Sequence, residues 1–408
     1  MRRCSQFSWK TKSALLCAVV CLTACTHKDK VVISPLANPA APGSITPNET
    51  QIATGQVLLS WLEPANDGLA LRYAVRGADG WSEPRTVVAR NNFDKYAEAP
   101  PWVLSLPDHS LLSVWAEKLP KGKSKWEGNY LYTSASSDDG KTWTQPVIVH
   151  SDRTNGEHSF ASLAVQDSSH AAIVWLDSRD YDVRHTYRLM SAVISSSGTV
   201  SDEQTVDDDV CTCCPTGLVK TETGLVAAYR NHTKEEIRDI YTVRQESGKW
   251  QAGKAINEKD GWHINGCPVN GGALAQRQNE VAAVWYTGIE EKASLQVAFS
   301  KDGGATFPVV RTIDSSRENS QPLGRPAIAL LSSGNALITW ITHENGTSHL
   351  VAAQVNSQGS ERQREELSQG NTDSLGYPRM QLIGKDALLS WGGAGESKKV
   401  NTALLRTR

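Results

Sequence analysis

Short apolar stretches that end in an aromatic residue recur along the chain. Seven such stretches occur, and their aromatic residues are separated by 51 to 60 positions. Each stretch has the length of one β-strand and is followed by turn-forming residues. Self-similarity at this period is typical of a β-propeller, in which each repeat forms one blade. The stretches end at Trp61, Trp115, Trp175, Tyr229, Trp285, Trp340 and Trp391.

Each repeat has the same internal order of predicted strands. A first strand, often preceded by proline as at Pro101 and Pro268, leads into the aromatic-ended strand, and two more strands follow. The last repeat shows three clear strands, so we expect a strand within "KVVISPL" near the amino terminus to close the ring. Residues 45–408 are therefore predicted to form an all-β propeller of four-stranded antiparallel blades. Seven blades are favoured, and six is the alternative if the terminal repeats share a blade.

Two predicted turns carry more information than the others. The phrases "SSDDGKTW" (136–143) and "SKDGGATF" (300–307) resemble the Asp box of sialidases and related propellers. We expect Asp138 and Asp302 to accept hydrogen bonds from the turn backbone, because this is how short acidic side chains stabilise turns. The sequence therefore predicts a structural role for these two aspartates.

Several longer phrases carry a family resemblance. "EHSF", "WLDSR", "CTCCPT", "YRNHTKEEIRDIY" and "WHINGCPVNG" resemble bacterial secreted or lipid-anchored proteins known as sialidase-like or BNR-repeat proteins. The resemblance covers most of residues 45–400 and implies a sialidase-like propeller. An activity does not follow from it, since fold does not establish function.

The amino terminus has the pattern of a secretory signal. Residues 1–24 combine basic residues with a short apolar run, and "LTAC" at its end resembles a bacterial lipobox. We expect a signal peptide over 1–24, a lipid anchor at Cys25 and a flexible tether over 25–44. Thr26 in place of aspartate favours, by resemblance, an outer membrane lipoprotein that faces the periplasm or the cell surface.

The charge of the mature chain limits the choice of partners. Removal of residues 1–24 leaves 38 Lys and Arg residues against 44 Asp and Glu residues. This mildly acidic balance gives no indication of nucleic-acid binding. We expect a monomer that contacts the membrane through its lipid and binds an anionic small molecule or glycan.

Charged residues cluster at the positions that should surround the mouth of the propeller channel. The starts of the first strands and the loops after the second strands share one face, where side chains from all blades converge. An alternative interpretation is that ion pairs between neighbouring blades account for these charges. The expected ligand-binding residues are Glu157, His158, Arg179, Arg230, Arg238, Arg325 and Arg379.

A sialidase would need three arginines on the substrate carboxylate, an acid and a tyrosine nucleophile. By resemblance, Asp177, Asp239 and Tyr229 are the catalytic candidates. The Arg-Ile-Pro phrase of the first sialidase blade is absent, because the corresponding place reads "SITPNET". Two hypotheses follow: a membrane-anchored sialidase-like glycosidase that binds an acidic sugar, or a non-catalytic binding or assembly module of the cell envelope.

Four cysteines follow the lipid site, and they are Cys211, Cys213, Cys214 and Cys267. An even number in an oxidising compartment favours disulfides. Cys214 and Cys267 each precede a proline at equivalent places in adjacent repeats, so they are the expected long-range pair, with Cys211 and Cys213 paired locally. Two alternatives stay open, namely a thiolate site for Cu(I) or Zn(II) and a redox-active pair.

Overall fold

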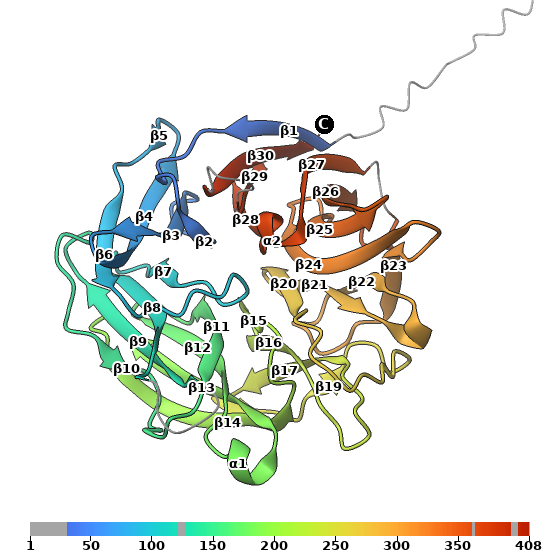
Figure 1. The fold of residues 1–408 in the computed structure, drawn as a ribbon, viewed down its shortest axis with the longest axis horizontal. Helices are drawn as coiled ribbons and strands as arrows, with labels where there is room; N and C mark the ends of the chain where they lie inside the picture. The colour runs from blue at the N-terminus through green and yellow to red at the C-terminus, as the bar shows by residue number, and fades with distance from the viewer. Residues whose placement is uncertain (1–30, 121–126, 361–363, 393–398, 408) are drawn as a thin grey trace, which may run out of the picture.

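The computed structural model describes residues 31–120, 127–360, 364–392 and 399–407, and these form seven antiparallel sheets around a common centre (Figure 1). Each sheet contains one aromatic-ended stretch as the second strand from the centre. We call the sheets blades 1 to 7 in chain order, beginning with the sheet that contains Trp61. The predicted all-β propeller of antiparallel blades is confirmed, with four strands in five of the sheets and five strands in blades 1 and 4.

Blades 1 to 4 run from the centre outwards in chain order. Blade 1 contains β2 (Ile45–Gln51), β3 (Val57–Ala65), β4 (Gly68–Gly77), β5 (Gly80–Trp81) and β6 (Arg85–Arg90). Blade 2 contains β7 (Trp102–Ser105), β8 (Leu111–Lys118), β9 (Asn129–Ser136) and β10 (Val147–Ile148). Blade 3 contains β11 (His158–Val165), β12 (His170–Asp177), β13 (Tyr187–Ser195) and β14 (Val200–Val210). Blade 4 contains β15 (Gly217–Thr221), β16 (Gly224–Arg230), β17 (Ile240–Glu246), β18 (Lys249–Trp250) and β19 (Lys254–Ala255).

The remaining blades follow the same plan. Blade 5 contains β20 (Gly272–Arg277), β21 (Glu280–Thr287), β22 (Ser294–Ser300) and β23 (Val309–Ser315). Blade 6 contains β24 (Ser320–Leu330), β25 (Ala336–Glu344), β26 (Thr347–Val355) and β27 (Glu365–Gly370). Blade 7 contains β28 (Arg379–Ile383), β29 (Asp386–Trp391), β30 (Asn401–Thr407) and β1 (Val31–Leu36).

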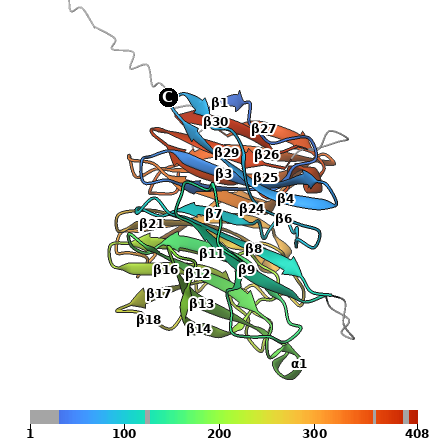
Figure 2. The same cartoon turned by 90° about the vertical axis from the view of Figure 1, so that its left-hand side faces the viewer.

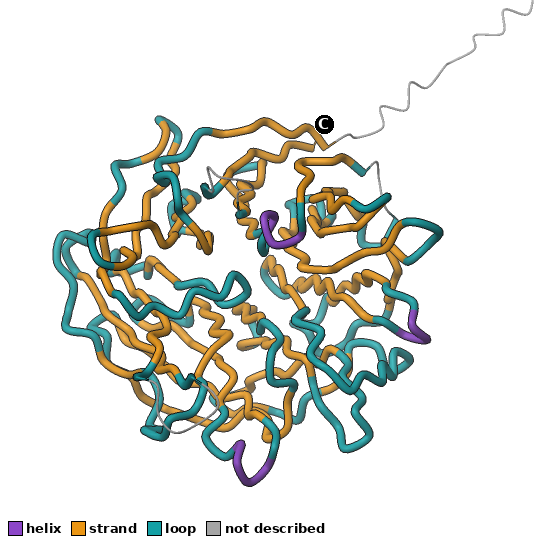
Figure 3. Tube along the Cα trace, viewed as in Figure 1, coloured by secondary structure: helices purple, strands orange, loops and turns teal. Residues whose placement is uncertain are grey.

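Helices are short insertions between strands (Figure 3), and they are α1 (Tyr181–Arg184), η1 (Ile289–Glu291) and α2 (Thr372–Leu375). In the described ranges none of them has the length and apolar character required to span a bilayer. The expected signal peptide and the lipid site Cys25 lie outside the described residues.

The ring is closed by strand β1. It pairs antiparallel with β30 along its whole length, from Val31 opposite Thr407 to Leu36 opposite Thr402, and the two strands lie side by side in both views (Figures 1 and 2). The amino-terminal strand expected from the sequence is therefore present as the outermost strand of blade 7. Residues 31–36 of the predicted tether thus form a strand that covers an edge of the sheet, while residues 25–30 lie outside the described residues.

The hydrophobic core is divided among the interfaces between blades. One cluster joins Leu112 and Leu131 of blade 2 to Leu163 and Ile173 of blade 3, and similar clusters lie between other neighbouring blades. Each blade is apolar on both faces because it packs against a neighbour on each side. The centre of the ring is a channel lined by the first strand of every blade.

The two Asp-box turns have the structure expected from the sequence. The Asp138 carboxylate accepts hydrogen bonds from the backbone amide and the hydroxyl of Thr142, at 2.9 and 2.7 Å. Asp302 binds Thr306 in the same way, at 3.0 and 2.6 Å. These hydrogen bonds hold the pKa of both aspartates below the usual range. Both residues stabilise hairpins and are not part of the channel mouth.

A second repeated contact involves the aromatic residues of the repeat. In five blades the indole nitrogen of the tryptophan donates a hydrogen bond to a buried or partly buried carboxylate, because a buried indole N–H requires a partner. We call these contacts the tryptophan–acid pairs. They join Trp61 to Glu63 (2.7 Å), Trp115 to Glu117 (2.8 Å), Trp175 to Asp177 (3.0 Å), Trp285 to Asp260 (3.0 Å) and Trp340 to Asp314 (2.8 Å).

Candidate functional site

A cavity of about 580 Å³ lies at the mouth of the ring, beside blades 2 to 5. We call it the mouth cavity. It is bounded by residues that precede the first strands and by residues in the loops after the second strands, as the sequence predicts for this face. Its lining includes Glu98, Glu157, Arg179, Tyr187, Cys213 and Cys267.

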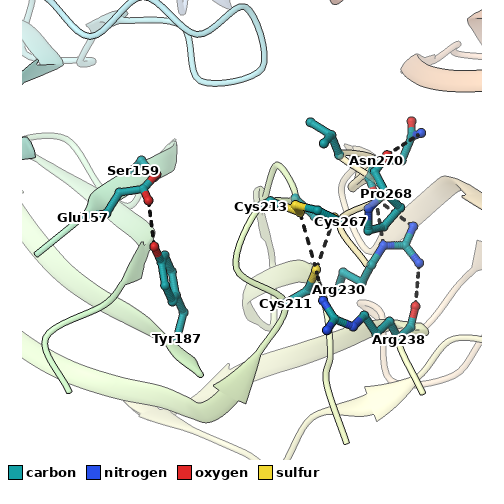
Figure 4. The surroundings of a disulfide bond; sticks show 12 residues. Glu157, Ser159, Tyr187, Cys211, Cys213, Arg230, Arg238, Cys267, Pro268 and Asn270 are labelled. Carbon is teal, nitrogen blue, oxygen red and sulfur yellow. Dashed lines mark hydrogen bonds between the residues drawn. A yellow bond between two sulfur atoms is a disulfide. The ribbon is translucent and has the colours of Figure 1, made fainter. Parts of the chain in front are cut away.

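A tyrosine and a glutamate form a hydrogen-bonded pair in this cavity (Figure 4). The Tyr187 hydroxyl donates to Glu157 Oε2 at 2.7 Å, and the Ser159 hydroxyl donates to Glu157 Oε1 at 2.9 Å. Burial raises the pKa of Glu157 above its ordinary value, although both hydrogen bonds oppose this shift. Burial and the adjacent Glu157 carboxylate also raise the pKa of Tyr187. A carboxylate held this close to a hydroxyl can act as its general base.

The charge of the mouth cavity is acidic. Among the described residues that line it, the carboxyl groups come from Glu98, Glu127, Glu157 and Asp182, and the basic group is Arg179. Arg179 is already paired, since its Nη2 lies 2.7 Å from Asp177 Oδ2 and 2.6 Å from Glu203 Oε1. Glu127 is paired as well, with Lys118 Nζ at 3.1 Å. An anionic ligand would therefore meet the carboxylates of Glu98 and Asp182 without a free cation among the described lining residues.

The arginines expected to bind ligand are engaged with the protein. Arg230 is buried, and its guanidinium donates to the backbone carbonyls of Asn270 (2.7 and 2.9 Å), Tyr286 (2.8 Å) and Arg238 (2.6 Å). Arg238 donates to Glu236 Oε2 at 2.7 Å and to the sulfur of Cys211 at 3.5 Å. These bonds tie blade 4 to blade 5.

Two further arginines hold other parts of the ring. Arg325 donates to the backbone carbonyls of Thr372 and Gly376, at 3.0 and 3.1 Å, and lies over the ring of Tyr377. Arg379 donates to the backbone carbonyl of Glu98 at 3.3 Å, and burial lowers its pKa to about 10. Three arginines around one free space, which a sialidase-type carboxylate site requires, are not found among the described residues. The arginine-lined anion site therefore stays a prediction, and the contacts of these arginines do not support it.

The three catalytic candidates have structural contacts. Tyr229 is fully buried, and its hydroxyl donates to Asp207 at 2.5 Å. Asp177 is buried between the indole of Trp175 and Arg179. Asp239 accepts hydrogen bonds from the backbone amides of residues 261 and 262, at 3.0 and 2.8 Å. None of the three lines the mouth cavity, so we withdraw their catalytic assignment.

His158 is also in the interior. Its ring is fully buried and stacks on His150 with a centroid distance of 3.6 Å, while its two nitrogens contact the Asn129 carbonyl at 2.8 Å and Asp152 Oδ2 at 3.0 Å. The sequence placed His158 next to Glu157 at the mouth. The side chains of consecutive residues in a strand point to opposite faces, and here the glutamate faces the cavity.

The cysteines pair differently from the expectation. A disulfide joins Cys213 to Cys267, while Cys211 and Cys214 are free and buried. A turn at residues 212–213 directs Cys213 towards the mouth cavity and leaves Cys214 in the interior. The predicted Cys214–Cys267 and Cys211–Cys213 bonds are therefore wrong, although the predicted link between these two segments exists.

The possible metal site has a geometric basis. The sulfur atoms of Cys211, Cys213 and Cys214 lie within 4.8 Å of one another. Three thiolates at this spacing suit Cu(I) or Zn(II). However, Cys213 is bonded to Cys267, so this group can supply three thiolate ligands only after reduction of the disulfide.

Sequence reasoning missed Tyr187. It begins the third strand of blade 3, whereas the repeat drew attention to the aromatic residues at the ends of the second strands. The register of β12 and β13 places it beyond the end of β12, near the segment that precedes β11. A tyrosine after the "WLDSR" loop was the available signal.

The ring of blades and the Asp-box hairpins define a β-propeller of the sialidase-like class. The chain belongs to the BNR repeat-like domain family, whose model matches residues 66–385. This confirms the resemblance inferred from the sequence phrases. No match was found among curated proteins.

Solved structures share the fold at low sequence identity. The α-L-arabinofuranosidase Arb93A from Fusarium graminearum, in complex with an iminosugar inhibitor, is 13% identical with a TM-score of 0.50, over 93% of this chain and 97% of that chain. A protein of unknown function from Dyadobacter fermentans is 14% identical with a TM-score of 0.49, over 93% and 98%. The NanB sialidase from Streptococcus pneumoniae is 11% identical with a TM-score of 0.48, over 93% and 70%.

Proposed function

We propose that the protein binds a glycan in the mouth cavity and hydrolyses a glycosidic bond with the Glu157–Tyr187 pair. The observation that carries this proposal is the 2.7 Å hydrogen bond between the Tyr187 hydroxyl and Glu157 Oε2 inside a cavity large enough for a sugar. A nucleophile within hydrogen-bond reach of a base is the arrangement that covalent catalysis needs. The glycosidase fold of the neighbouring structures is consistent with this use.

The proposed reaction has two steps. The Tyr187 oxygen attacks the anomeric carbon while its proton passes to Glu157, and the bond between that carbon and the leaving oxygen breaks. A second carboxyl of the cavity, such as Glu98, protonates the leaving oxygen. Water then attacks the tyrosyl glycoside and loses a proton to Glu98, while Glu157 returns its proton to the departing Tyr187 oxygen, so the sugar is released and all three groups regain their starting protonation states.

The acidic lining favours a neutral sugar as the ligand. Glu98 and Asp182 add negative charge, while Glu127 is paired with Lys118 and Arg179 is neutralised by two carboxylates. The acidic sugar expected from the sequence is therefore the competing ligand. A binding or assembly module without turnover is the competing function.

The lipid anchor at Cys25 remains part of the proposal. Strand β1 begins at Val31 on the outer edge of blade 7, so an anchored chain would present that edge to the membrane. A mass increase on the amino-terminal peptide of the membrane-extracted protein, lost in Cys25→Ser, would support the anchor. An unmodified peptide that begins elsewhere would contradict it.

The test is hydrolysis of a panel of aryl glycosides that includes neutral furanosides, neutral pyranosides and a sialoside. We expect turnover of a neutral member, with kcat reduced about 10²-fold or more in Glu157→Gln and in Tyr187→Phe. Glu127→Gln, which changes another carboxyl of the same cavity, is the matched control and should retain most of the activity. Binding without turnover would favour the module, and preference for the sialoside would overturn the ligand assignment.

A further inference from the structure

Four sulfur atoms gather at or just behind the wall of the mouth cavity in two different states, and Figure 4 shows Cys211 beside the Cys213–Cys267 bond. Cys213 and Cys267 are bonded, whereas the Cys211 and Cys214 sulfurs are free and lie 3.6 Å apart. The Cys211 sulfur also lies 3.9 Å from the sulfur of Cys213. One free thiol is therefore near both a second free thiol and a disulfide.

The surroundings of Cys211 favour its thiolate form. Arg238 Nη1 donates to the Cys211 sulfur at 3.5 Å, and the backbone amide of Cys211 is held by the Arg230 carbonyl at 3.0 Å. The Cys214 thiol, together with the charges of Arg230 and Arg238, lowers the pKa of Cys211. Thiolates, and not thiols, attack disulfides. Cys211 is thus the nucleophile of the group.

The disulfide is accessible, unlike the two thiols. Cys267 is exposed and lies in the segment between β19 and β20, and both bonded cysteines line the mouth cavity. Cys211 and Cys214 are each 1% exposed. A sulfur released at Cys267 would be solvated, which helps it to leave as a thiolate.

We propose that the four cysteines form an intramolecular thiol–disulfide exchange site. The Cys211 thiolate attacks the sulfur of Cys213, a Cys211–Cys213 bond forms, the Cys213–Cys267 bond breaks, and Cys267 leaves as a thiolate. Cys214, after losing its proton to the Cys267 thiolate or to water, then attacks Cys211 and releases Cys213. One disulfide and two thiols are present before and after, so no oxidant or reductant is consumed.

The exchange has a consequence for the mouth cavity. In the observed state the disulfide ties the segment before β15 to the segment before β20. In the exchanged state this tie is absent, and the thiols of Cys213 and Cys267 face the cavity. There they can react with the disulfide of another molecule, which the buried pair cannot reach.

The test uses the purified full chain without reductant and N-ethylmaleimide as the probe. Trypsin releases the first three cysteines in the peptide 189–220 and Cys267 in the peptide 260–277. The two peptides stay joined in the observed state and separate in the exchanged state. We expect maleimide to appear on Cys267 within about an hour, the time scale of unassisted disulfide rearrangement, while a Cys211–Cys214 bond forms.

Two matched variants separate the steps. Cys211→Ser removes the nucleophile, so labelling of Cys267 should slow by at least about tenfold. Cys214→Ser removes only the second step, so Cys267 should still be labelled and a Cys211–Cys213 bond should accumulate within peptide 189–220. Thermal melting of both variants checks that they are folded, and either variant alone still gives a result.

Three outcomes would overturn the proposal. The first is wild-type protein whose two peptides stay joined as long as those of Cys211→Ser. The second is a chain with two disulfides and no labelled cysteine. The third is a native chain that carries copper or zinc and takes four labels once denatured, because the cysteines would then be metal ligands.

Discussion

The tryptophan–acid pairs and the contact region of blades 4 and 5 bury polar groups between blades in different ways. Each tryptophan–acid pair is a single hydrogen bond from an indole, and three of the five join residues two positions apart. In blade 4 the repeat position is Tyr229, and Arg230 bonds backbone carbonyls on the side of blade 5, while Arg238 and the buried thiols of Cys211 and Cys214 lie in contact with one another next to it. We call these four residues the cysteine–arginine sector.

The difference shows where the propeller departs from its repeat. The pairs use one kind of contact, an indole N–H on a carboxylate, so the contact can be repeated from blade to blade whether the acid lies two or about 25 positions away. The cysteine–arginine sector instead uses a buried cation with four hydrogen bonds to backbone carbonyls, and its thiols lie next to a disulfide on the mouth cavity. The tryptophan–acid pairs stabilise the scaffold, and the exceptional contact places buried thiols next to a disulfide.

The largest expected effect comes from removal of the buried cation. In Arg230→Met the carbonyls of Asn270, Tyr286 and Arg238 lose their donor, and each unpaired buried carbonyl costs about 1–3 kcal/mol. We expect the free energy of unfolding to fall by roughly 4 kcal/mol, measured by urea denaturation. Arg406→Met, which removes a partly exposed ion pair with Asp386, is the control and should change it by about 0.5 kcal/mol or less.

An equal loss in the two variants would contradict the comparison, because the sector would then contribute no more than an ordinary surface contact. If water entered the site and donated hydrogen bonds to the freed carbonyls, the loss of stability in Arg230→Met would be smaller than the value expected above. We expect the m-value, which is the slope of the free energy of unfolding against urea concentration, to be the same in the variant and in the wild type. The reason is that the surface exposed on unfolding stays the same.

A smaller effect is expected at the repeat position itself. Trp285→Phe leaves the buried carboxylate of Asp260 without its indole donor, so the free energy of unfolding should fall by about 2 kcal/mol. Tyr229→Phe removes the bond to Asp207, which is partly exposed and can bond water, so about 1 kcal/mol should be lost. Thermal or urea denaturation of both variants measures which of them loses more stability. A larger loss in Tyr229→Phe than in Trp285→Phe would contradict this. It would mean that the tyrosine hydroxyl stabilises blade 4 as strongly as the indole N–H stabilises a blade with a tryptophan–acid pair.

At neutral pH the smallest effect comes from a buried polar group that is neutral, because its contribution to stability changes only below about pH 6.5. His150 Nε2 accepts from the Leu131 amide at 3.3 Å, and Nδ1 donates to the Asp152 carbonyl at 2.9 Å. Burial, and next the His158 ring, lowers the pKa of His150 to about 3. The unfolded chain binds this proton first, near pH 6.5, so stability is complete above that pH and falls towards pH 3 by up to about 1.4 kcal/mol per unit.

The variant His150→Gln isolates this contribution. A glutamine can accept from the Leu131 amide and donate to the Asp152 carbonyl, but it does not titrate. We expect a less steep loss of stability between pH 6.5 and pH 4 than in the wild type, measured by urea denaturation across that range. Parallel curves would show that His150 is protonated in the folded protein, and the contrast with the charged cysteine–arginine sector would be lost.

Much of the architecture follows from the sequence because it depends on short-range patterns. An apolar strand that ends in tryptophan predicts one blade, and the spacing of Ser136, Asp138 and Thr142 predicts a turn in which the Asp138 carboxylate bonds within its own hairpin. Strand β1 was predictable for a related reason, since the last repeat lacked one strand. Such features can be predicted without knowing which distant segments of the chain contact each other.

The functional groups were decided by tertiary structure. Tyr187 and Glu157 are 30 residues apart, Cys213 and Cys267 are 54 apart, and Arg230 reaches a carbonyl 40 residues away. A local turn or the register of a strand decides whether each side chain faces the cavity or the interior. The two positions of such a side chain differ by several ångströms. The sequence by itself determined the propeller, its Asp-box turns and the gathering of four cysteines between two neighbouring repeats. Only packing between blades decided which cysteines bond, where the arginines are neutralised and which tyrosine reaches the cavity, because these contacts join segments that are remote in the chain.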